Sequence, residues 1–230
     1  MSEVIFLQNV RLSFPHLTEK HASADNAKPK YSGDFLMTAD HKGYQEFMKK
    51  YGEIAAGKWH EHAENVMIMI HSDRKLRCYG AGEEKVNKKT FAPYDGYVGQ
   101  HYLTASNENM PQMIKPDGSV ADPLNTMECM TIARTMYGGC YVNVALKPWP
   151  QENAHGRGIR CDLVAIQFYA EGESFGEGAT DASNMFGAVA GAPAGAASPA
   201  GAAAPPIPGM SAAEPKADAP AMPGLPPFLQ

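Results

Sequence analysis

The alternation of side chains between Cys140 and Trp149 constrains the fold more than any other feature of the sequence. Apolar residues suited to a core share one face of an extended chain, namely Val142, Val144, Leu146 and Pro148. Polar and aromatic residues share the opposite face, namely Tyr141, Asn143, Ala145, Lys147 and Trp149. A period of two is typical of a strand that buries one face, whereas a helix would mix the two kinds of residue. This segment is therefore predicted to be a half-buried strand.

The same patterning predicts further strands. Residues 4–14 alternate, with Val4, Phe6, Val10, Leu12 and Phe14 on the face expected to be buried. This strand is expected to end at Pro15, because proline cannot donate a hydrogen bond to a sheet. The other predicted strands cover residues 31–38, 75–79, 97–106 and 158–169, and residues 111–117 are predicted to form a hairpin arm. The strand at 158–169 pairs with 140–149 through a hairpin loop at 150–156.

Helical spacing appears in two places. After Asp40, a candidate N-cap, apolar residues recur at helical intervals up to about Gly57, and residues 125–137 fit a second, shorter helix. The apolar run at 66–70 fits either a helix or a strand. The chain is therefore predicted to be mainly β with one or two inserted helices. The fold expected is an OB-fold, a five-stranded Greek-key barrel, although periodicity alone does not separate it from other small barrels.

The composition changes sharply near residue 170. Residues 1–170 hold 19 basic and 19 acidic side chains, whereas residues 171–230 hold one basic and six acidic ones. The formal net charge of −5 therefore comes entirely from the last 60 residues, which also hold 17 Ala, 9 Gly and 10 Pro. Such a segment lacks the apolar surface needed for a core. We expect a folded domain at 1–170 and a disordered, acidic, flexible tail at 171–230.

Several classes of protein are excluded by the sequence. It contains no apolar run of about 18 residues that would cross a membrane. The N-terminus has no basic segment followed by a cleavage site, so we expect no signal peptide. The four cysteines form no Cys-x-x-Cys pair, and buried free thiols are the expected state.

The aromatic face of the 140–149 strand suggests contact with nucleic-acid bases. Exposed aromatic rings are costly without a use, and stacking on a base is worth roughly 1–3 kcal/mol. The alternative is that a loop or a second subunit covers these rings. Basic and aromatic residues also interleave at 28–31, 74–79 and 85–97, a mixture that fits a groove for a single strand. Because the domain is neutral, such a groove requires its basic residues to gather on one side.

These patterns define the candidate binding residues. Phosphate contacts are expected from basic side chains, namely Lys28, Lys30, Arg77, Lys88, Lys89, Lys147 and Arg160. Base stacking is expected from aromatic side chains, namely Tyr79, Phe91, Tyr94, Tyr102, Tyr141 and Trp149.

Evidence for catalysis or for a metal is weak. His60, His62 and His71 lack the spacing of a zinc protease motif, and no phosphate-binding loop or nucleophile motif occurs. We therefore expect no catalytic residues, no metal and no cofactor. Two alternatives to nucleic-acid binding stay open: a metal-dependent nuclease, and a protein-interaction or virion-structural module.

Three segments resemble one known family. Residues 9–17, 28–37 and 160–169 resemble single-stranded-DNA-binding proteins of bacteriophages with an OB-fold. The resemblance implies a protein that coats and protects single-stranded DNA, without reading its sequence, during phage DNA replication and recombination in the cytoplasm of an infected bacterium. It also implies a tail that recruits replication proteins through a terminal aromatic residue, here Phe228, although few acidic residues precede it. Homo-oligomer formation is left open.

Overall fold

The computed structural model describes residues 4–22, 27–154 and 156–176. Contacts along the chain divide it into two units, Met1–Thr180 and Asp181–Gln230, and the second unit lies outside the described residues. Most of the predicted tail, including Phe228, therefore also lies outside them.

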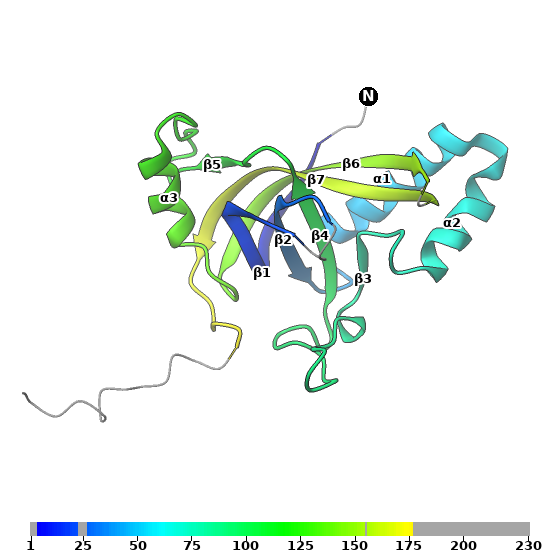
Figure 1. Ribbon diagram of the computed structural model, residues 1–230, viewed down its shortest axis with the longest axis horizontal. Helices are drawn as coiled ribbons and strands as arrows, with labels where there is room; N and C mark the ends of the chain where they lie inside the picture. Colours follow the sequence, from blue (N-terminus) through cyan, green and yellow to red (C-terminus); the bar gives the residue numbers. More distant parts are fainter. Residues whose placement is uncertain (1–3, 23–26, 155, 177–230) are drawn as a thin grey trace, which may run out of the picture. The chain divides into compact units, whose positions relative to one another are not determined.

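The described residues form one seven-stranded sheet (Figure 1). Its order is β3-β4-β2-β1-β6-β7-β5, and every neighbouring pair is antiparallel except β5 and β7. The strands are β1 (Ile5–His21), β2 (Lys30–Met37), β3 (Tyr79–Ala81), β4 (His101–Asn107), β5 (Gln112–Ile114), β6 (Tyr141–Asn153) and β7 (Gly156–Ala170).

Five of these strands make the predicted barrel. The long β1 pairs with β2 on one side and with β6 on the other. The Asn107 side chain of β4 donates a hydrogen bond to the carbonyl oxygen of Leu163 on β7, at 3.2 Å, which brings the two ends of the curved sheet together. Within the sheet these five strands follow one another as β4-β2-β1-β6-β7, and the contact between β4 and β7 closes them into an OB barrel, so the fold prediction is confirmed.

The alternation in the sequence becomes the core of this barrel. Leu12, Val142, Val144 and Leu146 are fully buried, and they come from the apolar faces of β1 and β6. The apolar face predicted for 140–149 is therefore the inner face. All four cysteines are buried and unpaired.

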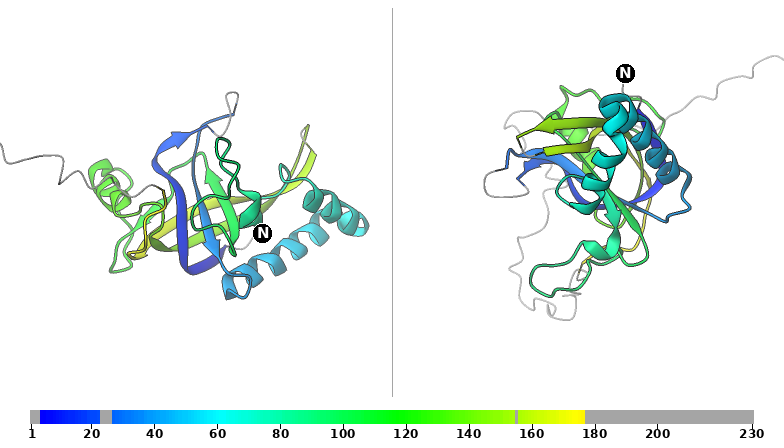
Figure 2. Two further views of the ribbon diagram at one scale, coloured as in Figure 1. Left: turned by 90° about the horizontal axis from the view of Figure 1, so that it is seen from below. Right: turned by 90° about the vertical axis from the view of Figure 1, so that its right-hand side faces the viewer.

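The helices lie outside the barrel at its two ends (Figure 2). At one end, α1 (Lys42–Trp59) and α2 (Ala63–Ser72) are separated by a 3-10 turn at His60–His62; at the other end lies α3 (Thr126–Arg134). The ambiguous run at 66–70 is thus helical. The cap of α1 is His41, whose Nδ1 accepts a hydrogen bond from the backbone N–H of Gly43, and not Asp40 as predicted. None of the helices in the described part of the chain is long and apolar enough to cross a membrane.

Several strand boundaries were predicted wrongly. The strands expected at 75–79 and 97–106 begin instead at Tyr79 and His101, because turns at 74–76 and 95–99 precede them. β1 continues through Pro15 to His21 because its pairing with β2 shifts between Ser13 and His16, and an irregularity of this kind accommodates a proline. The final hairpin also reaches much further than predicted, since β6 and β7 stay paired up to Asn153 and Gly156. The last two changes lengthen the tips that project from the barrel.

The chain stays packed on the domain after residue 170. The Tyr137 hydroxyl donates to Glu171 at 2.6 Å, and the N–H of Phe175 donates to the carbonyl oxygen of Gly138 at 2.8 Å. Gly139 adopts a φ of +110°, and a Cβ at this position would lie 2.0 Å from the carbonyl oxygen of Glu173. Ordered contacts therefore continue to Gly176, beyond the boundary expected at residue 170.

Candidate nucleic-acid interface

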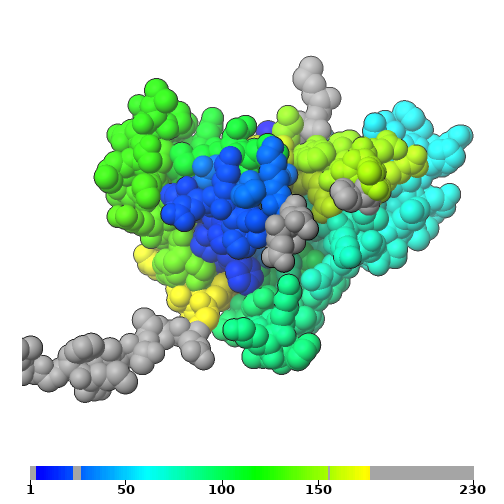
Figure 3. Space-filling view, in the orientation of Figure 1, coloured from blue at the N-terminus to red at the C-terminus, as the bar shows by residue number. Residues whose placement is uncertain are grey.

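Three projecting segments surround the outer side of β2 and β4. They are the described part of the end of the β1–β2 hairpin (residues 16–22 and 27–31, called the β1–β2 tip), the segment 82–100 between β3 and β4, and the described part of the end of the β6–β7 hairpin (residues 147–154 and 156–160, called the β6–β7 tip). Figure 3 shows all three on one face of the molecule. In OB domains, the outer face of the second and third barrel strands and the adjoining loops bind oligonucleotides. Here those strands are β2 and β4.

Three lysines, Lys20, Lys28 and Lys30, lie near the end of the β1–β2 hairpin. Lys28 forms an ion pair with Glu108, with 2.6 Å between Nζ and Oε2. This hydrogen bond, together with the charges of Lys28, Lys30 and Lys20, lowers the pKa of Glu108. The Nζ of Lys20 lies 5.5 Å from the centre of the Tyr31 ring, a cation–π contact. Glu108 therefore faces three ammonium groups, and Glu19 on the same hairpin offsets part of their charge.

Two histidines lie on the same hairpin. The rings of His16 and His21 stack with their centres 4.2 Å apart. Burial and the neighbouring His21 lower the pKa of His16. This pair adds positive charge to the hairpin only when it is protonated.

Residues 85–94 form a narrow loop, here called the finger. Val86 pairs with Pro93 in an isolated bridge, and the N–H of Asn87 donates to the carbonyl oxygen of Ala92 at 2.9 Å. At its end, Phe91 adopts a φ of +57° and is 81% exposed. Lys88 and Lys89 are also exposed, and neither makes an ion pair with another described residue. The finger therefore presents a free aromatic ring beside two free ammonium groups.

The β6–β7 tip carries a second mixed group. Lys147 is exposed and Trp149 is half-buried, with its Nε1–H donating to Asp162 at 2.7 Å. Arg160 donates to the Gln151 side chain and to the carbonyl oxygen of Lys75. A hollow of about 410 Å³ opens here, lined by Asp73, Lys75, Leu76, Gln151, Asn153 and Arg160.

Three of the candidate residues are not available on the surface. Tyr79 is only 4% exposed, because its ring packs edge-on against Phe47 and Tyr51 of α1. Tyr102 is 3% exposed, and burial raises its pKa to about 12. The Arg77 side chain is 9% exposed and is paired with Glu84 at 2.8 Å. The structure thus covers three side chains that were expected to be exposed to DNA, because the sequence alone does not reveal the helix and the loop that lie over them.

The other aromatic candidates occupy intermediate positions. Tyr94 is half-buried and packs edge-on against Phe14, with 4.9 Å between ring centres. The Tyr141 ring lies under the guanidinium of Arg11, 5.6 Å away. Phe6 and Phe14 were expected to face the core, yet they are 51% and 44% exposed. Register shifts between Leu7 and Val10 and between Ser13 and His16 reverse the faces of β1 on either side of its middle.

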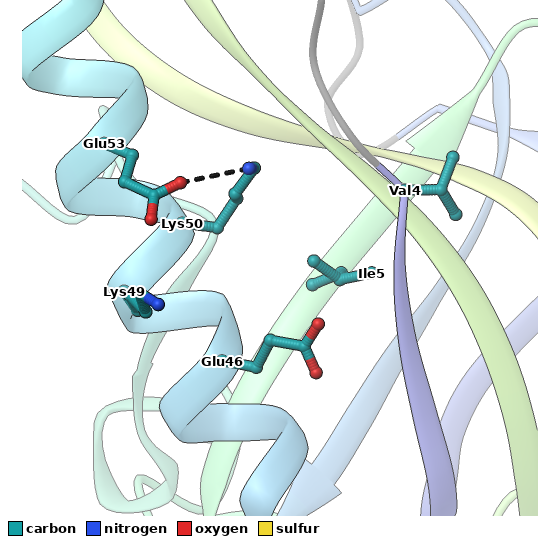
Figure 4. A pocket seen from close by; sticks show the side chains of 6 residues that line it. All are labelled: Val4, Ile5, Glu46, Lys49, Lys50 and Glu53. Carbon is teal, nitrogen blue, oxygen red and sulfur yellow. Dashed lines mark hydrogen bonds and ion pairs between the residues drawn. The ribbon is translucent and has the colours of Figure 1, made fainter.

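Neither the histidines nor the other hollow indicates catalysis. Among residues 4–22, 27–154 and 156–176, no group of three or more His, Cys, Asp or Glu side chains lies close enough to hold a metal. Between the start of β1 and α1 lies an open pocket of about 240 Å³. Two glutamates and two lysines line it, with Lys50 paired to Glu53 at 3.0 Å (Figure 4). Its charges balance, so it offers no field that would attract a polyanion.

Comparison with known proteins identifies the family of the chain. The family model described as "Enterobacter phage Enc34, ssDNA-binding protein" matches residues 3–194. A putative protein p50 of Acyrthosiphon pisum secondary endosymbiont phage 1 is 30% identical over 173 residues, covering 74% of this chain and 85% of the relative.

Solved structures share the fold. The single-stranded DNA-binding protein of bacteriophage Enc34 in complex with ssDNA superposes with a TM-score of 0.58 at 24% identity, covering 75% of this chain and 89% of that one. The same phage protein, in a structure described without ssDNA, gives a TM-score of 0.56 at 24% identity, over 79% and 89% of the two chains. With a family model matching most of its length, the chain belongs to the Enc34 family of phage single-stranded-DNA-binding proteins.

Proposed function

We propose that this protein coats single-stranded DNA without reading its sequence, during phage DNA replication and recombination in the cytoplasm of the infected bacterium. One observation carries the proposal: basic and aromatic side chains from three distant segments gather around β2 and β4, although the folded domain as a whole is neutral. Family membership supports the same function.

The revised interface has two kinds of contact. Phosphates lie against basic side chains, namely Lys20, Lys28, Lys30, Lys88, Lys89, Lys147 and Arg160. Bases stack on Phe91 and on the partly exposed rings, namely Tyr31, Tyr94, Tyr141 and Trp149. Stacking tolerates any base because every base has a π face, and phosphate contacts carry no sequence information.

The proposal also assigns separate roles to the folded domain and to the tail. Residues 1–170 supply the binding domain, and the acidic segment 171–230 recruits replication proteins through Phe228. We propose no catalytic activity and no cofactor.

The two tryptophans provide the test. Trp59 is 5% exposed on α1, whereas Trp149 is half-buried beside Arg160, so bound bases reach only Trp149. Titration with oligo-dT should quench the fluorescence, and increasing salt should reverse the quenching. The Trp149→Phe variant, which keeps Trp59, should bind by anisotropy but show no quenching. The absence of any salt-dependent binding would refute the proposal.

A parallel incubation separates binding from catalysis. Labelled single-stranded DNA is mixed with the protein and Mg²⁺, Mn²⁺ or Zn²⁺. We expect the DNA to stay intact, and cleavage would instead favour the nuclease alternative. Failure to bind any polynucleotide, together with large oligomers in solution, would favour an interaction or virion-structural module.

A further inference from the structure

A buried carboxylate occupies the middle of the surface to which we assign DNA. The Asp34 side chain on β2 is 5% exposed. Its Oδ2 accepts hydrogen bonds from the Lys85 Nζ and from the Tyr97 hydroxyl, each at 2.7 Å. Its Oδ1 accepts from the Thr104 hydroxyl at 2.5 Å. A negative charge at this position is unexpected in a surface that binds a polyanion.

These contacts join the barrel to the finger. Thr104 on β4 lies directly opposite Asp34 in the sheet register, so it belongs to the barrel. Lys85 begins the finger, and its backbone carbonyl accepts from the N–H of Tyr94 at the other side of the finger, at 3.1 Å. Asp34 therefore holds the base of the finger on the outer face of β2 and β4.

Tyr97 fixes the chain just beyond the finger. Its ring is fully buried and packs with Leu36 and Tyr102. Burial and the charge of Asp34 raise the pKa of Tyr97, so the hydroxyl remains a donor. Lys85 also lies over the Tyr102 ring, 4.6 Å from its centre. Each polar group named here has a partner, which is the condition for a buried network to be rigid.

We propose that Asp34 is a positioning residue for DNA binding: it neutralises Lys85 and fixes the finger so that Phe91, Lys88 and Lys89 face the DNA. This inference rests on the proposed function. Asp34 itself does not touch DNA, and its charge is cancelled inside the protein. Removing it leaves the Lys85 ammonium without a counter-charge in a mostly buried site, which favours detachment of the finger.

The proposal predicts an effect opposite in sign to that of simple electrostatics. Loss of a negative charge from a DNA-binding surface should strengthen binding. Loss of a positioning residue should weaken it, because the finger no longer presents its ring and its two ammonium groups. The sign of the change therefore distinguishes the two roles.

The test uses the full chain, fluorescein-labelled oligo-dT and anisotropy over a range of salt. For Asp34→Asn, which keeps the size of the side chain, we expect affinity to fall at least about fivefold, the loss of one stacked base. The salt slope should fall by about 1.4, since two lysine contacts are lost. Glu46→Gln is the matched control, because it removes the same charge from an exposed position on α1; its affinity should stay unchanged or rise slightly.

A double variant links the effect to the finger. If Asp34 acts through the finger, Asp34→Asn combined with Phe91→Ala should bind no more weakly than the weaker of the two single variants. Additive losses, an unchanged salt slope, or tighter binding by Asp34→Asn would each overturn the inference. In every one of these cases wild-type binding still stands as evidence for the proposed function. If wild type itself fails to bind, the proposed function is refuted instead.

A milder change covers the case in which Asp34→Asn does not fold. Tyr97→Phe keeps the buried ring and removes only the hydroxyl that donates to Asp34. We expect a smaller fall in affinity that is again not additive with Phe91→Ala. Equal affinity of Tyr97→Phe and wild type, with the fold intact by circular dichroism, would contradict a positioning role for this network.

Discussion

The finger lysines give the sharpest quantitative prediction for the DNA interface. Lys88 and Lys89 are exposed, and neither has an ion-pair partner among the described residues, so their full charge is available to phosphates. Each phosphate neutralised on a single strand contributes about 0.7 to the slope of log affinity against log salt. The double variant Lys88→Gln/Lys89→Gln should therefore lower the slope by about 1.4.

This change in slope has a measurable consequence. A fourfold rise in salt, from about 50 to about 200 mM, should cost the wild type about sevenfold more affinity than the variant, because four to the power 1.4 is about seven. The defect of the variant should thus be large at low salt and small at high salt. Anisotropy of labelled oligo-dT at four salt concentrations measures it.

Two controls separate local contacts from net charge. Lys42→Gln/Lys49→Gln removes the same charge from exposed positions on α1, and its slope should stay close to that of wild type. Lys28→Gln should change the slope by less than 0.7, because Glu108 already neutralises part of the charge of Lys28. Equal slopes for the finger variant and the α1 variant would refute the assignment of the finger to the interface.

Three further outcomes are expected. Phe91→Ala should weaken binding by about 1–3 kcal/mol through lost stacking, with the salt slope unchanged; a reduced slope would show that the ring acts through the lysines. Because burial and His21 hold the pKa of His16 below 6.5, a bound phosphate should raise it. DNA binding then takes up a proton, so affinity should rise as the pH falls through the pKa of His16. If the affinity of His16→Asn depends on pH in the same way as that of wild type, His16 is not the group that takes up the proton. Leu146→Ala, at a fully buried position, should lower the free energy of unfolding by about 2–5 kcal/mol in urea titrations while leaving the salt slope intact.

The barrel could be predicted from the sequence because a strand has a period of two. Once Val142, Val144 and Leu146 share a face, that face must be the buried one, and the structure places all three in the core. The same reasoning failed for Phe6 and Phe14, which are exposed. Register shifts between Leu7 and Val10 and between Ser13 and His16 interrupt the alternation, and no local pattern announces where such a shift occurs.

The candidate site was predicted only in part. Periodicity predicts which face of a strand a residue lies on, but not whether another element covers that face. Phe91 and Lys89 proved exposed. Tyr79 lies in an equally basic and aromatic stretch, yet it is covered by α1.

The sequence by itself determined the β-rich class of the domain, the inner face of its main strands, the acidic excess of the last 60 residues and the family resemblance. These depend on composition and on neighbours along the chain, which are local properties. The tertiary structure decided which rings remain available to bases, which lysines are already paired, and that Asp34, Lys85, Tyr97 and Thr104 meet. These residues are as many as 70 positions apart, and only the closure of the sheet and the packing of the segment 82–100 across β2 and β4 bring their side chains together.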